Sequence, residues 1–267
     1  MCPFPFSVPL ELSDATFSGP TQPSSKEAQA LSQLRDNLSS KKLLPLPDRL
    51  CHCGDEDSAL LRFLHARKLD VKKAEKMLEE TLEYRSSNDF HSALERQFDP
   101  EITSRMRAAQ PNAYYGQDRA GRPLYLEFTG HVKSDAIVDL GLDSVTSVHI
   151  SAMEFLNQIL CREASVRNGE VVHQVTAVMD ARNLTLAKAR RLLSGNIFST
   201  LSKIDSDHYP ETMARTIVIN APRVASAVFS LAAPFLDAKT REKIHIVNEK
   251  QSMHASALHT GAKLFRA

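Results

Sequence analysis

The sequence predicts an all-helical N-terminal lobe followed by an α/β lobe whose sheet is mainly parallel. Apolar residues in the first third of the chain recur at helical spacing, which predicts amphipathic helices. Beyond Pro100–Ala109, itself predicted to be helical, short apolar runs alternate with long helical segments. Parallel strands need a crossover of a dozen or more residues, which these segments supply. The length of 267 residues suits one large domain with an appendage.

Residues 1–25 are predicted to be disordered, because prolines are scattered among Ser, Thr and Gly without any helical or strand period. Lys26–Ser40 follows with good helix formers and an apolar stripe, and the proline-containing stretch from Pro45 to Pro47 ends it. The stripe consists of Ala30, Leu31, Leu34 and Leu38. A short amphipathic helix is the prediction.

Two further helices complete the N-terminal lobe, predicted to span 26–90. Asp55 can cap a helix with the apolar stripe Ala59, Leu60, Phe63 and Leu64. Asp70 can cap the next, with Val71, Ala74, Met77, Leu78 and Leu82 on one side. Together these two helices are predicted to make a small helical unit.

The α/β lobe is predicted to span 91–247, with residues 248–267 as an atypical tail. Its predicted strands are Leu124–Phe128, Val171–Met179, Thr216–Ile219 and Ile244–Val247. Its predicted helices are Ser144–Ala164, Thr185–Ile204 and Arg223–Ala232. Strand alternation puts Val175, Ala177 and Met179 on one face of the central strand.

Composition and motifs exclude several function classes. The 33 basic and 32 acidic residues leave a net charge of +1, which excludes a chain-wide basic field for nucleic acid. No stretch is long and apolar enough for a membrane span, and no secretory signal is visible. The four cysteines do not resemble a disulfide framework, so a reducing cytosol is the expected compartment.

Motifs for phosphate, acyl or metal chemistry are also missing. The nine glycines form neither of the two phosphate-binding patterns, G-x-G-x-x-G and G-x-x-x-x-G-K, and there is no G-x-S-x-G elbow. The Cys51–Cys53 run is too tight for a zinc pair. Asp207 beside His208 is the one candidate catalytic pair, and a helix cap or turn is the favoured interpretation of it. We therefore predict no enzyme, no catalytic residue, no metal and no cofactor.

The segment Arg223–Ala232, with the Ala-Pro-Phe-Leu that follows, is apolar around almost its whole circumference. Such a helix is either buried on every side or faces an apolar cavity. Both alternatives remain open: a buried core helix, or a lid over a greasy pocket.

Four segments resemble the CRAL-TRIO domain of lipid-transfer proteins, in particular its Sec-fourteen-like phosphatidylinositol-transfer branch. They are DEDSALLRFLHARKLDV, AGRPLYLEFTG, VTAVMDARNLTL and the long run from His208 to Val247. The last is the most specific, since Y-P-E, I-N-A-P and P-F-L-D-x-x-T-x-x-K-I occur in the family's order. The resemblance implies a sheet that floors a lipid cavity, closed by a gate helix at about Arg223–Phe235.

The resemblance also implies site residues. Those matching the family's headgroup positions are Arg67, Lys68, Glu211, Thr240 and Lys243. Those implied to line the cavity or the gate are Tyr115, Tyr125, Val175, Ala177, Met179, Val228, Phe229, Leu231 and Phe235. The headgroup set is chemically reasonable, because a phosphodiester needs cationic donors and inositol hydroxyls need an acceptor.

Two departures from the family pattern bear on the ligand. Val175 and Ala177 stand where members that also carry phosphatidylcholine have hydroxyl side chains, so the pocket is expected to suit a second, weakly polar lipid such as a sterol. After Val247 the family's usual continuation is replaced by a different tail, so the C-terminal part of the domain is expected to be missing.

The resemblance implies a cytoplasmic, monomeric carrier that visits membranes transiently and exchanges phosphatidylinositol there, without covalent chemistry and without nucleic acid. A lipid-independent regulatory or interaction module, with Asp55–Asn88 as its binding surface, is one alternative. A shortened, non-functional isoform is another.

Overall fold

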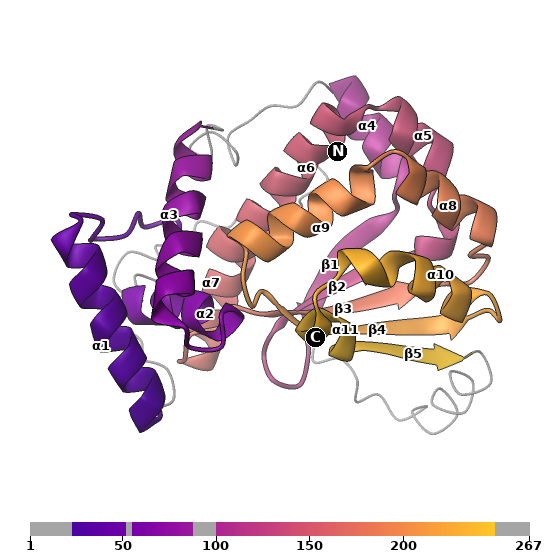
Figure 1. Ribbon diagram of the computed structural model, residues 1–267. Coiled ribbons are helices and arrows are strands. Elements are labelled where there is room, and N and C mark those ends of the chain that lie inside the picture. The colour runs from indigo at the N-terminus through magenta and orange to yellow at the C-terminus, as the bar shows by residue number, and fades with distance from the viewer. Residues whose placement is uncertain (1–22, 52–54, 88–99, 249–267) are drawn as a thin grey trace.

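The computed structural model describes residues 23–51, 55–87 and 100–248. The predictions of disorder over 1–25 and of a tail over 248–267 fall almost wholly outside these ranges, as does most of the Cys51–Cys53 run. Two lobes are visible in Figure 1: a helical lobe at the left, and a sheet at the right with helices stacked along one of its faces.

The helical lobe consists of α1 (Ser25–Ser40), α2 (Glu56–Ala66) and α3 (Val71–Ser87). Each begins at a side-chain cap, since Ser24, Asp55 and Asp70 accept hydrogen bonds from backbone N–H groups of the first turn. The two caps predicted at Asp55 and Asp70 are therefore confirmed.

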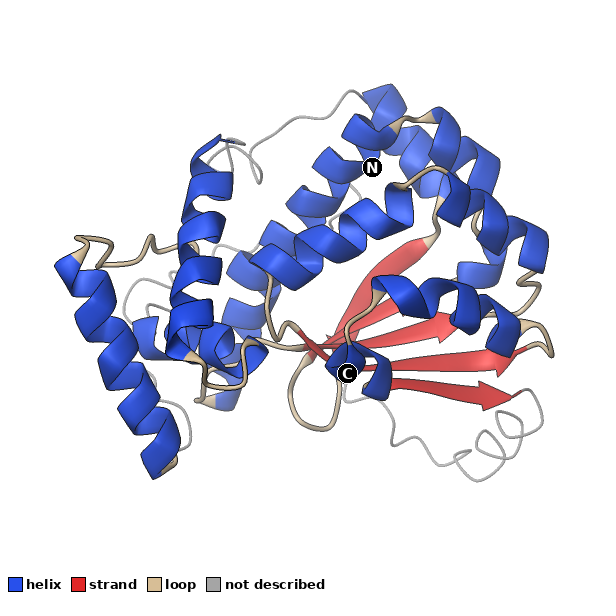
Figure 2. Cartoon of the chain, in the orientation of Figure 1, coloured by secondary structure: helices blue, strands red, loops and turns tan. Residues whose placement is uncertain are grey.

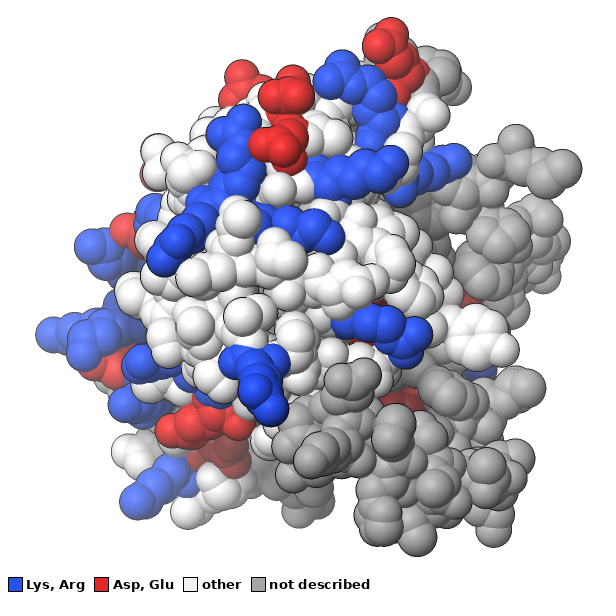
Figure 3. All heavy atoms as spheres, turned by 90° about the vertical axis from the view of Figure 1, so that its right-hand side faces the viewer, with Lys and Arg blue, Asp and Glu red and all other residues white. Residues whose placement is uncertain are grey.

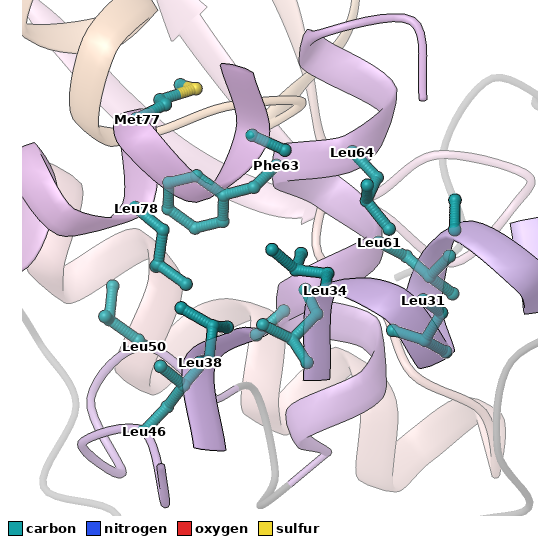
Figure 4. Packing of buried hydrophobic residues seen from close by; sticks show 14 residues of the cluster. Leu31, Leu34, Leu38, Leu46, Leu50, Leu61, Phe63, Leu64, Met77 and Leu78 are labelled. Carbon is teal, nitrogen blue, oxygen red and sulfur yellow. The ribbon is translucent and has the colours of Figure 1, made fainter. Parts of the chain in front are cut away.

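The core of this lobe is the predicted one. All four stripe residues of α1 are buried, and the four of α2 are completely inaccessible. Figure 4 shows Leu34 and Leu38 of α1 pointing toward Phe63 of α2 and Leu78 of α3. Leu46 and Leu50, from the loop between α1 and α2, close one side of the cluster.

The α/β lobe contains a five-stranded sheet in the order β1-β2-β3-β4-β5. Its strands are β1 (Asn112–Gln117), β2 (Pro123–Glu127), β3 (Val175–Asp180), β4 (Met213–Ala221) and β5 (Ile244–Asn248). The β1–β2 pair is antiparallel and the other three pairs are parallel. The predicted mainly parallel sheet is thus confirmed, and β1 is a strand that the prediction lacked.

The remaining elements connect the strands. The helices are α4 (Pro100–Ala109), α5 (Ser134–Asp139), α6 (Leu142–Phe155), α7 (Cys161–Asn168), α8 (Leu186–Ser194), α9 (Ile197–His208), α10 (Ala225–Ala232) and α11 (Ala238–Glu242). Two 3₁₀ turns are η3 (Thr129–His131) and η5 (Ala233–Phe235), and η4 (Leu156–Leu160) is a π-helical turn. Figure 2 shows most of these helices gathered above the strands.

One of two long predicted helices is continuous and the other is divided. Ser144–Ala164, predicted as one helix, is an unbroken helical segment in which the π-helical turn η4 joins α6 to α7. Thr185–Ile204 was also predicted as one helix; the chain breaks at Gly195 and Asn196, where Asn196 has a left-handed φ of 56°. Such a backbone conformation interrupts the helical hydrogen-bond ladder, and α9 starts afresh in a new direction.

Candidate lipid-binding site

The apolar segment, defined as α10 with η5 (residues 225–235), is not a buried core helix. Ala225 is the one buried residue in it; Val228 and Phe229 are half-buried, while Leu231 is 39% and Phe235 is 43% exposed. The main packing partner of α10 outside the segment is α8, rather than the strands. Of the two alternatives left open by the sequence, burial on every side is therefore wrong.

One ring contact fastens the end of the apolar segment. Phe235 lies edge-on to Phe198 of α9, with ring centroids 6.0 Å apart. Apart from this contact, the segment presents a surface of small and apolar side chains without any charge. Such a surface needs an apolar partner to be stable in water.

The sheet face toward α6 and α7 contains the predicted strand residues. Val175 is packed against Leu156 and Cys161, and Ala177 is buried. Met179, nearest the carboxyl end of the strand, is half-buried. Val175 therefore belongs to a filled part of the interior.

The tyrosine assignment on β1 needs a correction. Tyr115 was predicted to line the cavity or the gate, but it is 59% exposed. Tyr114 pairs with Tyr125 instead, with ring centroids 5.2 Å apart, and burial raises the pKa of Tyr114 above its ordinary range. The cause is strand alternation: Tyr114 and Tyr115 are neighbours on β1, so their side chains lie on opposite faces of the sheet, and the pairing register puts Tyr114 opposite Tyr125.

A charged cluster lies where β4 begins and α11 ends. Glu211, at a left-handed φ of 58°, accepts a hydrogen bond from Lys239 at 2.5 Å and another from Lys243 at 3.3 Å. Lys243 also donates to the carbonyl of Met213. Thr240 bonds Asp237 through both its backbone N–H and its hydroxyl, which forms the cap of α11. The structure thus brings together three of the five predicted headgroup residues, and adds Lys239 to them.

The electrostatics of the cluster keep its carboxylate ionised. Burial alone would raise the pKa of Glu211, but the hydrogen bond from Lys239 and the charges of Lys243 and Lys239 lower it below its ordinary value. An ionised carboxylate is an acceptor only, so Glu211 is suited to hydroxyl donors, and the two ammonium groups are suited to an anion.

Arg67 and Lys68 lie at the turn after α2 and are not joined to this cluster by any hydrogen bond or ion pair of the described residues. Arg67 is the C-cap of α2 and is half-buried, whereas Lys68 is exposed and has a left-handed φ of 54°. These two cations belong to the helical lobe, while Glu211 and Lys243 belong to the other.

Between the lobes lie two residues that the sequence analysis did not single out, His173 and Arg62. The pKa of His173 is lowered to about 3, by burial first and then by the positive charge of Arg62, and it is also affected by Glu211, His65 and Lys243. The buried Arg62 donates to the carbonyl of Leu50, and burial lowers its pKa to about 10. The charges that act on His173 thus come from both lobes. The sequence feature that could have indicated this site is Arg62, an arginine within the apolar stretch of α2.

A second polar contact between the lobes is fully buried. Arg85 of α3 donates two hydrogen bonds, of 2.9 and 2.8 Å, to the carboxylate of Glu154 on α6. The hydroxyl of Tyr209, from the Y-P-E motif, donates to the same carboxylate at 2.7 Å. This network joins α3 to α6 and to the C-cap of α9.

His208 has a structural environment rather than a catalytic one. Its ring is stacked on Tyr84 at 4.0 Å, and its Nδ1 lies 3.2 Å from the hydroxyl of Thr81. Asp207 forms an ion pair with Lys203. The neighbouring Asp and His thus belong to the packing of α9 on α3, as the favoured interpretation of a turn or cap suggested.

In the described ranges, no group of three or more metal-ligating side chains comes together. None of the helices described there has the length and apolar character needed to cross a bilayer.

Comparison with known proteins defines the class of this two-lobed fold. Residues 30–80 match the model of the CRAL/TRIO N-terminal domain, and residues 108–259 match the model of the CRAL/TRIO domain. The chain belongs to the CRAL/TRIO family. A solved structure, the crystal structure of Sfh5, has the same fold with a TM-score of 0.64 and 15% identity, over 85% of this chain and 82% of that one.

Several curated relatives are named as phosphatidylinositol/phosphatidylcholine transfer proteins. The chain is 31% identical, over 84% of its length, to the phosphatidylinositol/phosphatidylcholine transfer protein SFH13 of Arabidopsis thaliana, of which it covers 35%. It is 30% identical to the SEC14 cytosolic factor of Eremothecium gossypii, over 90% of this chain and 75% of that protein. The chain spans only 35–40% of the length of the Arabidopsis relatives.

Proposed function

We propose that this protein is a cytosolic lipid carrier that takes phosphatidylinositol into its interior beneath the apolar segment and exchanges it at membranes. The observation that supports this most strongly is the apolar segment itself. It is uncharged and half-exposed, and it is packed mainly against α8, so it has apolar surface that a bound acyl chain would cover.

The cost of exposing acyl chains to water explains why such a carrier must enclose its lipid. Moving a 16-carbon chain from a bilayer into water costs about 0.8 kcal/mol per CH₂, or roughly 12 kcal/mol in all. In an apolar protein interior the acyl chain passes from one apolar medium to another, and most of this free-energy barrier is removed. The apolar segment acts as a gate that opens on the membrane and closes before the protein departs.

Selectivity for the headgroup rests on the Glu211 cluster. Lys243, with Arg67 and Lys68 from the other lobe, pairs with the phosphodiester, and the ionised Glu211 accepts hydrogen bonds from inositol hydroxyls. Lys239 keeps Glu211 ionised when Lys243 turns to the phosphate. Thr240, bonded to the cap residue Asp237, adds a hydroxyl to the same surface. The names of the curated relatives support this ligand class.

A second ligand of low polarity is also part of the proposal. Val175 and Ala177 place no hydroxyl on the inner face of β3, so nothing there would hold the phosphocholine group. A sterol-like lipid needs fewer polar partners than phosphatidylcholine. No covalent step is involved in this exchange.

The decisive experiment is lipid extraction and mass spectrometry of the purified full chain, followed by vesicle-to-vesicle transfer assays. Bound phosphatidylinositol, and its loss in Lys243→Ala and Glu211→Ala, would support the proposal. The matched control is Lys72→Ala, which removes an exposed lysine of the helical lobe. Protein that contains no lipid would favour a lipid-independent interaction module. Unchanged phosphatidylinositol transfer by both site variants would contradict the headgroup assignment.

A further inference from the structure

The surface around the apolar segment is rich in basic side chains. The stretches 182–196 and 222–236 together contain five cations and no Asp or Glu, although the whole chain has a net charge of only +1. These cations are Arg182, Lys188, Arg190, Arg191 and Arg223. Because α8 packs against α10, the two stretches lie side by side. Figure 3, which looks onto this side of the molecule, shows Lys and Arg side chains gathered around a broad uncharged area.

Two of these cations are available for an external partner. Arg190 and Arg223 are exposed, and neither side chain has a hydrogen bond or ion pair within the described ranges. Arg191 pairs with Asp135, whose side chain is 80% exposed, and Arg182 lies 3.7 Å from Asp180. Lys188 donates to the carbonyl of Gly130. The positive charge of this surface is therefore only partly compensated.

Exposed apolar side chains lie beside the cations. Val224, next to Arg223, is 37% exposed, and Leu231 and Phe235 of the apolar segment are exposed to a similar degree. Cations beside protruding apolar side chains match the interface of an anionic bilayer, which offers negative headgroups above an apolar interior. A nucleic acid would satisfy the cations but offers no apolar medium for these three side chains.

We propose that α8, Arg223 and the exposed apolar side chains of residues 224–235 form a docking surface for anionic membranes. Arg190 and Arg223 attract the headgroups, and Val224, Leu231 and Phe235 enter the interface, so that the apolar segment faces the lipid. The inference rests on the proposed function, because it assigns the membrane-facing side of the same segment and adds a preference for acidic lipids.

The test measures binding of the full chain to vesicles of phosphatidylcholine, with and without about 30% phosphatidylserine, at low ionic strength. The wild-type protein should prefer the anionic vesicles, and added salt should abolish the preference. Arg190→Gln combined with Arg223→Gln should weaken this binding about 25-fold, since each cation near an anionic surface contributes about fivefold.

Three controls make the result specific. Lys26→Gln combined with Lys72→Gln removes the same charge from exposed sites on the helical lobe and should bind like wild type. Arg190→Lys combined with Arg223→Lys keeps the charge and should retain binding. Because the chain contains no tryptophan, Leu231→Trp introduces a single fluorophore whose emission should shift to the blue on anionic vesicles.

Several results would overturn the docking surface. These are equal affinity for neutral and anionic vesicles, an equal loss in the Lys26/Lys72 control, or an unshifted fluorescence emission of the Leu231→Trp variant. Competition by duplex DNA as strong as that by anionic vesicles would instead indicate a nucleic-acid site.

Lipid extraction separates this inference from the proposed function. The glutamine double variant should contain as much phosphatidylinositol as wild type, because its changes lie outside the headgroup cluster. Wild-type protein that binds anionic vesicles but contains no lipid would contradict only the proposed function. Protein that contains lipid but shows no preference for anionic vesicles would contradict only the docking surface.

Discussion

Arg85 and Glu154 form a two-pronged, almost inaccessible ion pair that connects α3 of the helical lobe to α6 of the α/β lobe. Because the hydroxyl of Tyr209 shares the carboxylate, this single pair fixes both the lobe contact and the approach to β4. The position of the Glu211 cluster, two residues beyond Tyr209, therefore depends on it.

Removing one partner of this pair leaves a buried charge without compensation. Arg85→Met should lower the free energy of unfolding by about 3–5 kcal/mol, measured by urea denaturation at neutral pH. The double change Arg85→Met with Glu154→Leu removes both charges and should recover most of that loss. A double variant as unstable as the single one would show that packing, rather than charge, is decisive here.

Gly130 lies where the backbone leaves no room for a side chain. A Cβ added there would lie 1.5 Å from the carbonyl oxygen of Arg182, so η3 and the turn after β3 would have to separate. Gly130→Ala should cost at least about 2 kcal/mol of stability, by analogy with overpacked cores. Gly195→Ala is the matched control, since its nearest contacts are at 3.6 Å and beyond, and its midpoint of thermal unfolding should stay close to that of wild type.

Acid should destabilise the protein partly through His173. Its folded-state pKa of about 3 lies well below the unfolded value of about 6.5, so below pH 6.5 the unfolded chain binds a proton that the folded chain does not. Its contribution is complete above pH 6.5 and is lost as the pH falls toward 3, at up to about 1.4 kcal/mol per pH unit. In His173→Gln the unfolding free energy should change less between pH 7 and pH 5. Parallel curves for the two proteins would contradict this assignment.

The contact between Phe198 and Phe235 should control opening of the apolar segment. An edge-to-face aromatic pair contributes about 0.5–1.5 kcal/mol, so Phe198→Ala should increase the open population roughly two- to tenfold. Hydrogen exchange of residues 225–235 should accelerate, with little change in the helical lobe. If exchange in this segment is unchanged, the ring contact does not hold it in place.

The inner face of β3 allows a test of ligand choice. Val175→Thr with Ala177→Ser adds two hydroxyls at the positions where the family resemblance implies hydroxyl side chains in phosphatidylcholine carriers. Phosphatidylcholine recovered from the purified variant should rise relative to phosphatidylinositol, as measured by mass spectrometry. Thr200→Val, a change on α9 away from β3, should leave that ratio unaltered.

The sequence alone predicted those elements in which the spacing of apolar residues coincides with the face that is buried. Leu34 and Leu38 of α1 and Phe63 of α2 belong to apolar stripes at helical spacing, and all three are completely buried. Amphipathic helices bury such stripes by packing them against one another. The parallel order of β2, β3 and β4 followed from the long crossovers between them. These are consequences of local pattern and chain length.

The parts that the sequence missed depend on contacts between distant residues. Strand β1 lacks an apolar run, and pairing with β2 defines it. Tyr114 rather than Tyr115 faces inward because of the register in which β1 pairs with β2, which places Tyr114 opposite Tyr125. Lys239 joined the headgroup cluster only once α11 had brought its side chain to Glu211. Composition and periodicity do not reveal contacts between residues that are far apart in the sequence.

Strand order in the sheet follows chain order from β1 to β5. Among the five strands of the described ranges, none has to insert between two that are already paired, so each adds at a single growing edge. Long-range pairings are the slow steps of folding, and here each one involves only the strand made just before it. The sheet can therefore assemble from its first hairpin outward while the chain is still being synthesised.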